Sequence, residues 1–208
     1  MIGKDESTKW AEDGAAFSDP LQVNSFVKLI DKIRFEKTPQ WREKAFKNML
    51  KNEKYTKNGD VYYMEHAKPM GSEPLTAMKL GKWGYLTIFP NNRQIGEIKR
   101  IFGDNTLKKN DVYLVDKKSF YILKADLKNI GGGSISAIRD HIIEGSKQAP
   151  IIVMDITATA SRLNVIKGIR AGWDKKNTKI ILINWHGQWH QIERVNVHKK
   201  GRLESMIK

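Results

Sequence analysis

The chain contains no cysteine among its 208 residues. Disulfides, thiolate catalysis and cysteine-ligated zinc are therefore excluded. It also lacks any run that approaches the roughly 20 apolar residues of a membrane-spanning helix, and its N-terminal stretch, MIGKDESTKWAEDG, lacks the apolar segment of a secretory signal. We therefore expect no membrane span and no signal peptide, and any export would use another route.

Acidic residues are few relative to basic ones, with 23 Asp and Glu against 37 Lys and Arg, which gives a net charge of +14. An excess of this size favours a polyanionic partner, nucleic acid before anionic lipid, although a generic basic surface is the alternative. Hydrophobic residues make up 40% of the chain. At this length they can form one full core and a smaller appendage.

The stretch from residue 110 to residue 128 is predicted to be a β-hairpin that turns at Lys117 and Lys118. Strand side chains alternate between faces, so Asp111 faces one side of the first strand, and one face of the second carries charged residues in register. These residues are Lys124, Asp126 and Lys128. Such a face is costly inside a sheet unless it has a partner, and a divalent metal with a phosphate would supply one. A solvated edge hairpin is the alternative.

The pattern of apolar residues and breakers predicts an α/β (α+β) fold with a mixed sheet flanked by helices. We expect a flexible tail over residues 1–19, a small helical unit over 20–70, the main domain over 71–198 and a basic tail over 199–208. Within the main domain, the expected elements are a helix from Ser72, a strand at 85–89, an insertion with a short helix at 90–109, the hairpin, a helix after Gly131–Ser134, a buried strand at 150–156, a helix at 159–172 and strands at 179–184 and around 191–197.

The layout of an Asp on one strand and Asp-x-Lys on the next resembles the PD-(D/E)XK nuclease superfamily, whose core has the element order αβββαβ. Over residues 72–184 the likeness is closer. A helix-borne Glu precedes a strand that begins Gly84-Tyr85 and is followed by Pro90, and after the hairpin come a Ser-Ile helix ending in Gln148-Ala149 and the strand IIVMDI. Together these look like the C-terminal tRNase domain of CdiA-type contact-dependent growth inhibition toxins.

The resemblance implies that Asp111, Asp126 and Glu73 bind a divalent metal, Mg²⁺ or alternatively Mn²⁺. Such an ion would polarise the scissile phosphate and generate hydroxide. For Glu73, stabilising the helix N-terminus is the alternative role.

Two lysines compete for the role of the motif Lys, which helps to position the attacking water. If it is Lys128, Asp126-Leu127-Lys128 satisfies the pattern and Lys124 is an extra phosphate contact. If it is Lys124, Ile122 occupies the position of the acid, and Asp126 must supply the missing carboxylate from the same face.

Nucleic-acid contacts are expected from Lys124, Ser134, Gln148, Lys108 and Lys109. Gln148 resembles a glutamine near the active site of the family, with a cap or solvent role as the alternative. The turn that ends at Ser134 leads into a helix whose free N–H groups could bind phosphate, or it is a flexible linker.

Three further features have structural interpretations that we prefer. The spacing of His186 and His190 resembles that of metal ligands, but Gly187 between them predicts a turn. Trp185 and Trp189 could stack on unpaired bases, although packing at the sheet edge is favoured. Asp155 is an alternative acid, and its preferred interpretation is a strand-end residue paired with a cation.

These observations and the resemblance lead to one expectation: a metal-dependent, monomeric ribonuclease toxin domain that cleaves tRNA by phosphodiester hydrolysis. It would act in the cytoplasm of a target cell and have an acidic immunity protein as its partner. A DNA endonuclease of restriction or repair type is the alternative enzyme. A non-catalytic nucleic-acid-binding module with a degenerate motif is the alternative from another class.

Overall fold

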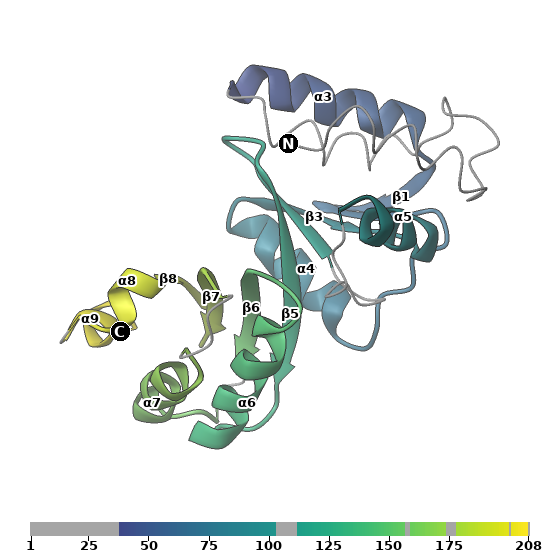
Figure 1. The fold of residues 1–208 in the computed structure, drawn as a ribbon. Coiled ribbons are helices and arrows are strands. Elements are labelled where there is room, and N and C mark those ends of the chain that lie inside the picture. The colour runs from purple at the N-terminus through teal and green to yellow at the C-terminus, as the bar shows by residue number, and fades with distance from the viewer. Residues whose placement is uncertain (1–37, 103–111, 157–158, 174–177, 200, 208) are drawn as a thin grey trace.

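The computed structural model describes residues 38–102, 112–156, 159–173, 178–199 and 201–207 (Figure 1). The strands of this part of the chain form one eight-stranded sheet in which they follow one another in sequence order. They are β1 (Tyr55–Asn58), β2 (Val61–Met64), β3 (Tyr85–Phe89), β4 (Val112–Asp116), β5 (Ile122–Ile130), β6 (Ile151–Ile156), β7 (Ile180–Trp185) and β8 (Gln188–Glu193).

The sheet is mixed. Strands β3, β4 and β5 form an antiparallel meander, and β5, β6 and β7 are parallel. At the edges, β2 runs parallel to β3, while β1 and β8 are antiparallel to their neighbours. The helices are α3 (Pro39–Asn52), α4 (Glu73–Lys82), α5 (Asn92–Phe102), α6 (Ile135–Ser146), α7 (Arg162–Gly172), α8 (Arg194–Val197) and α9 (Arg202–Met206). The general α+β class is therefore confirmed.

Local sequence explains where the helices start. Three helices begin at an N-cap with an extended backbone, namely Thr38, Ser134 and Ser161. The side-chain hydroxyl of each accepts the backbone N–H of the residue three positions later, which is the geometry of an N-cap. Helix α4 starts differently. Ser72 makes no side-chain cap bond there, and the carboxylate of Glu73 instead reaches back to the N–H of the residue three positions earlier.

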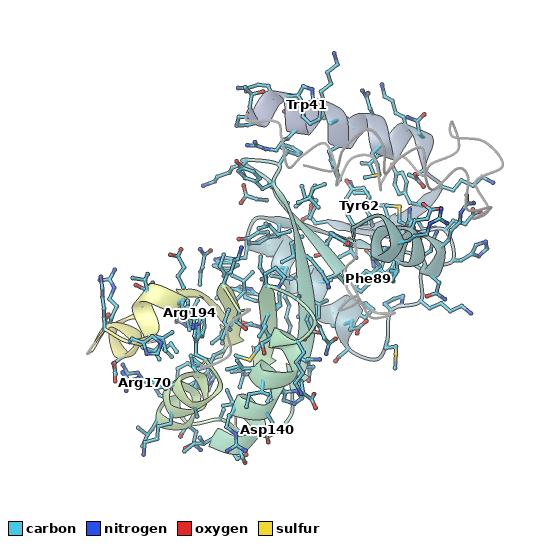
Figure 2. The ribbon with its side chains drawn as sticks, in the orientation of Figure 1. Trp41, Tyr62, Phe89, Asp140, Arg170 and Arg194 are labelled. Carbon is cyan, nitrogen blue, oxygen red and sulfur yellow. The ribbon has the colours of Figure 1, made fainter. Side chains whose placement is uncertain are left out.

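Helices cover both faces of the sheet. On one face, α6 and α7 lie side by side under β5 to β8, while α3 and α5 cover β2 to β4 (Figure 1). Tyr62 of β2 lies under α3 (Figure 2), where its ring meets that of Phe46 edge-on at 5.9 Å between centroids. Helix α4 packs on the opposite face, where Ala77 and Leu80 contact the cluster around Val153.

Several predicted elements are confirmed. The strand at 85–89 has the predicted bounds, and β6 is buried along its whole length, as its apolar run indicates. The insertion contains α5, and a helix follows Ser134. The last strand is displaced: β8 begins at Gln188, directly after a two-residue turn, and the backbone turns into α8 at Arg194.

Two predicted segments gain elements in the structure. Within the helical unit expected over residues 20–70, the sequence also predicts a short strand at Val61–Met64, and β2 has these bounds. The structure adds a strand at 55–58 and places both strands in the main sheet. The basic tail expected over 199–208 contains α9, and Leu203 of this helix and Ile207 directly after it are fully buried. Its positive charge is a surface property, whereas its apolar residues complete the core under β8. The Arg162 guanidinium holds the helix by donating to the Glu204 and Ile207 carbonyls.

We expect Leu203→Ala to lower the free energy of unfolding by about 2–5 kcal/mol, because it removes a fully buried side chain from the core. Urea unfolding followed by circular dichroism measures the change. Val195→Ala is the matched control, since Val195 is 57% exposed on the adjacent helix. Equal stabilities of the two variants would show that α9 does not belong to the core.

Candidate active site

A polar strip crosses one face of the sheet on β5. Lys124, Asp126 and Lys128 alternate with residues of the other face, and the same face carries Ile122 at one end and Ile130 at the other. Ile122 packs against the cluster under α3 and α5, whereas Ile130 belongs to the cluster under α6 and α7. The strip therefore lies between two apolar clusters, and the prediction that the three charged residues share a face is confirmed.

The central contact of the strip joins a carboxylate and an ammonium group. Lys128 Nζ lies 3.1 Å from Asp126 Oδ2, and the side chains are only 17% and 8% exposed. Removing either charge from such a site is strongly unfavourable for the one that remains. Because each side chain is largely buried, each charge depends on the other for compensation.

Helix α6 approaches the Asp126 carboxylate closely at Gly145. A Cβ at that position would lie 2.8 Å from Asp126 Oδ2 and 3.1 Å from Ile152 Cγ1, closer than ordinary contacts. Gln148 follows in the next turn: its backbone N–H donates to the Gly145 carbonyl at 2.9 Å, and the residue is 5% exposed. The Gln148 side chain donates from Nε2 to the Glu144 carbonyl at 3.4 Å, a contact at the end of α6 that fits the alternative role of a cap. Its role near the active site remains a prediction.

Three of the predicted residues, Asp111, Lys108 and Lys109, lie outside the described residues. The sequence places Asp111 directly before β4, whose first residue pairs with Ala125. The next pair in the register joins Tyr113 to Lys124. The roles of these three residues remain predictions.

Glu73 and Ser134 are engaged locally. Glu73 Oε2 accepts the Met70 N–H at 2.9 Å, and its helix packs on the face of the sheet opposite Asp126. Ser134 Oγ accepts the Ala137 N–H at 3.1 Å as the N-cap of α6. Both side chains thus have local partners at the start of their helices, and their predicted metal and phosphate contacts remain predictions.

The residues of the strip fit a hard cation in part. Within the described ranges no three His, Asp or Glu side chains are placed to hold a metal together. Mg²⁺, however, is usually held by one or two carboxylates, and water and substrate phosphate complete its octahedron. Asp126 could supply one oxygen ligand, and Asp111, next to β4 in sequence, is the candidate for a second.

A second group of polar residues lines a cavity of about 660 Å³ on the α4 face. Asp155 accepts from Lys79 Nζ at 2.5 Å and from Asn184 Nδ2 at 2.7 Å, so its predicted pairing with a cation is confirmed. Sequence reasoning missed Lys79 and Asn184. The only available signal was that Asn129 and Asp155, polar residues near the ends of two predicted strands, could share a face.

The histidine-containing turn and the two tryptophans that the sequence singled out have structural contacts. His186 and Gly187 form the β7–β8 turn, with φ of 51° and 78°, so the predicted turn is confirmed. Trp185 is buried and donates from Nε1 to the Ala160 carbonyl at 3.0 Å. Trp189 stacks on Trp83. Both tryptophans thus pack within the protein, as favoured.

Comparisons of the chain with protein-family models, with curated proteins and with solved structures find no match. Among the described helices, none has the length and apolar character that crossing a membrane requires. Inference about function therefore depends on the fold and on the chemistry of the site.

We expect Gly145→Ala to lower the free energy of unfolding by about 1–3 kcal/mol, because the new methyl group overlaps the Asp126 carboxylate. Gly96→Ala is the control, since a Cβ at that helical position meets nothing within 4 Å. The double variant with Gly145→Ala and Asp126→Ala should lose less free energy of unfolding than the sum of the two single losses, by about 0.5–3 kcal/mol. Additive changes in urea unfolding would contradict the close contact.

Proposed function

We propose that this chain is a metal-dependent nuclease of the PD-(D/E)XK class that cleaves RNA, with tRNA as the favoured substrate. The observation that carries the proposal is the Asp126–Lys128 pair, which joins the acid and the lysine of an acid-x-Lys motif at 3.1 Å on one strand face. A solvated edge hairpin would not need such burial, because both side chains would be in water.

The order and direction of the elements support the same class. Helix α4 is followed by the antiparallel strands β3, β4 and β5, with α5 inserted between β3 and β4, and α6 then leads to β6, which is parallel to β5. This order agrees with the αβββαβ core that the resemblance implies. The acid-x-Lys lies on the third strand of that core, and Asp111 directly precedes the second.

The residues of the strip have distinct tasks in phosphodiester hydrolysis. Asp126, with Asp111, would hold the metal ion, which when bound polarises the phosphate and lowers the pKa of a water molecule. Lys128 can donate to a phosphate oxygen or hold the attacking water. Lys124 lies on the same face two residues before Asp126, about 6.6 Å along the strand, and can contact a neighbouring phosphate.

The substrate and partner are proposed from charge and resemblance. A net charge of +14 attracts a polyanion, and the resemblance to tRNase toxin domains favours RNA over DNA. The same resemblance implies delivery to the cytoplasm of a target cell. It also implies an acidic immunity protein that covers the strip of the monomeric domain.

Incubation with total RNA and with plasmid DNA, with and without Mg²⁺, tests the proposal. We expect Mg²⁺-dependent cleavage of tRNA, and loss of cleavage in Asp126→Ala because the variant lacks a metal ligand. Asp140→Ala is the matched control, since Asp140 projects from the outer side of α6 (Figure 2). Plasmid cleavage alone would establish the DNA endonuclease, whereas RNA binding without cleavage would establish the non-catalytic module.

The two lysines can be distinguished by single-turnover rates. We expect Lys128→Ala to lower the rate of the chemical step by about 10²–10³, the usual effect of removing a transition-state contact. Lys124→Ala should instead weaken RNA binding in a salt-dependent way. The reverse result would make Lys124 the motif lysine. Unchanged rates in both variants would remove the strip from the active site.

A further inference from the structure

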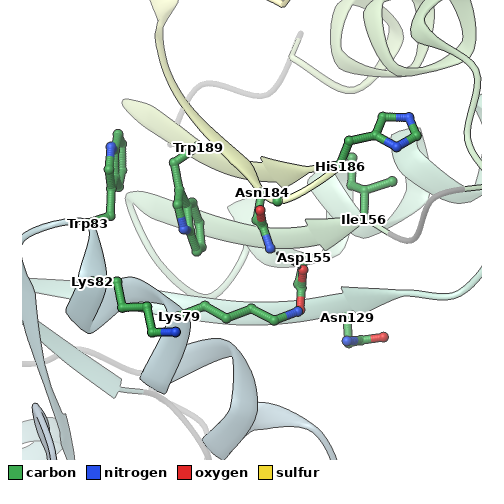
Figure 3. Close-up of a pocket in the computed structure, with 10 residues that line it drawn as sticks. Lys79, Lys82, Trp83, Asn129, Asp155, Ile156, Asn184, His186 and Trp189 are labelled. Atoms are coloured by element: carbon green, nitrogen blue, oxygen red, sulfur yellow. Dashed lines mark hydrogen bonds and ion pairs between the residues drawn. The ribbon is translucent and has the colours of Figure 1, made fainter.

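The cavity on the α4 face lies near the carboxyl ends of the parallel strands β5, β6 and β7 (Figure 3). Its floor is a row of residues in cross-strand register: Asn129 pairs with Asp155, Asp155 with Asn184, and Asn184 with Trp189. In sheets with parallel strands this end is where ligands commonly bind. A volume of about 660 Å³ is in the range of small-molecule sites.

Asn184 lines this cavity and carries a buried acceptor that has no partner among the described residues. Its Nδ2 donates to Asp155 Oδ1 at 2.7 Å, while Asp155 Oδ2 accepts from Lys79 Nζ. Because an ionised carboxylate can only accept, this contact fixes the orientation of the amide. Asn184 Oδ1 is consequently left buried, in a residue that is 5% exposed, and it accepts no hydrogen bond from the described residues. Such an atom is expected to have a partner.

The walls of the cavity supply two further kinds of contact. Trp83 and Trp189 stack with their ring centroids 5.4 Å apart and an interplanar angle of 11°, and both line the cavity (Figure 3). Lys82, from the last turn of α4, is exposed at the rim. Since the charge of Lys79 is already compensated by Asp155, Lys82 contributes a positive charge for a ligand.

We propose that this cavity binds a nucleotide. A ribose hydroxyl or a base N–H would donate to Asn184 Oδ1, the base would pack against the indole wall, and the phosphate would pair with Lys82. A nucleotide carries all three groups, and aromatic side chains accept any base. The nucleotide is either free or an unpaired residue of an RNA chain.

The proposed nucleotide site is separate from the Asp126–Lys128 pair. Asn129 follows Lys128 on β5, so its side chain lies on the opposite face of the sheet. The inference therefore does not rest on the proposed nuclease activity. In Asp126→Ala, cleavage should be lost while nucleotide binding is retained.

Calorimetric titration of the unsubstituted chain with adenosine 5′-monophosphate, adenosine and a six-residue oligoadenylate RNA tests the proposal. A chelator replaces Mg²⁺, so that the proposed nuclease does not cleave the RNA. We expect Lys82→Met to weaken binding of the monophosphate about 10-fold to 100-fold and to leave adenosine unchanged, because it removes a charged contact to the phosphate. Asn184→Ala should weaken the binding of both the monophosphate and adenosine. Lys118→Met, an exposed lysine in the β4–β5 turn, is the matched control.

The two sources of the nucleotide give different results. Binding of the monophosphate assigns a free nucleotide, and binding of the oligomer alone, weakened by Lys82→Met, assigns a residue of an RNA chain. The proposal is overturned if neither the monophosphate nor the oligomer binds, or if both variants bind them as tightly as the unsubstituted chain. Thermal unfolding of each variant checks that it is folded, and Lys82→Met, at an exposed position, keeps the test valid if Asn184→Ala does not fold.

Discussion

The contact on which the proposed site depends is the buried ion pair between Asp126 and Lys128. A carboxylate taken out of water needs a compensating charge, and the next residue of the same strand face provides it. The pair interrupts what would otherwise be one continuous apolar face. As a result α3 and α5 form one cluster with the sheet and α6 and α7 form another, and the glycine at position 145 lets α6 approach the carboxylate.

Strand β5 links two polar regions of opposite orientation. Its even-numbered residues form the strip with Asp126, while Asn129 starts the row that continues through Asp155 and Asn184. The first region combines an acid with a lysine, as phosphate chemistry requires. The second combines a fixed amide with an indole wall and a rim lysine, which suits recognition rather than hydrolysis. A chain of net charge +14 thus has two places where a nucleic acid or its components could be held.

Features encoded by short-range pattern could be predicted from the sequence. Alternation placed Lys124, Asp126 and Lys128 on one face, and the apolar run at 151–156 marked a fully buried strand. Contacts between distant segments could not be predicted. Lys79 and Asp155 are 76 positions apart and meet only because α4 crosses the sheet. The burial of Leu203 could not be predicted either, because the surrounding basic residues indicate an exposed segment.

Asp126 is proposed to be a metal ligand, and amide NMR of the protein titrated with Mn²⁺ tests this role. Bound Mn²⁺ broadens the signals of nearby amides, so the pattern locates the ion independently of any activity. We expect broadening centred on residues 126–128 of β5 that disappears in Asp126→Ala and persists in Asp140→Ala. Broadening that is unaffected by Asp126→Ala, or that is centred on Asp155, would contradict it.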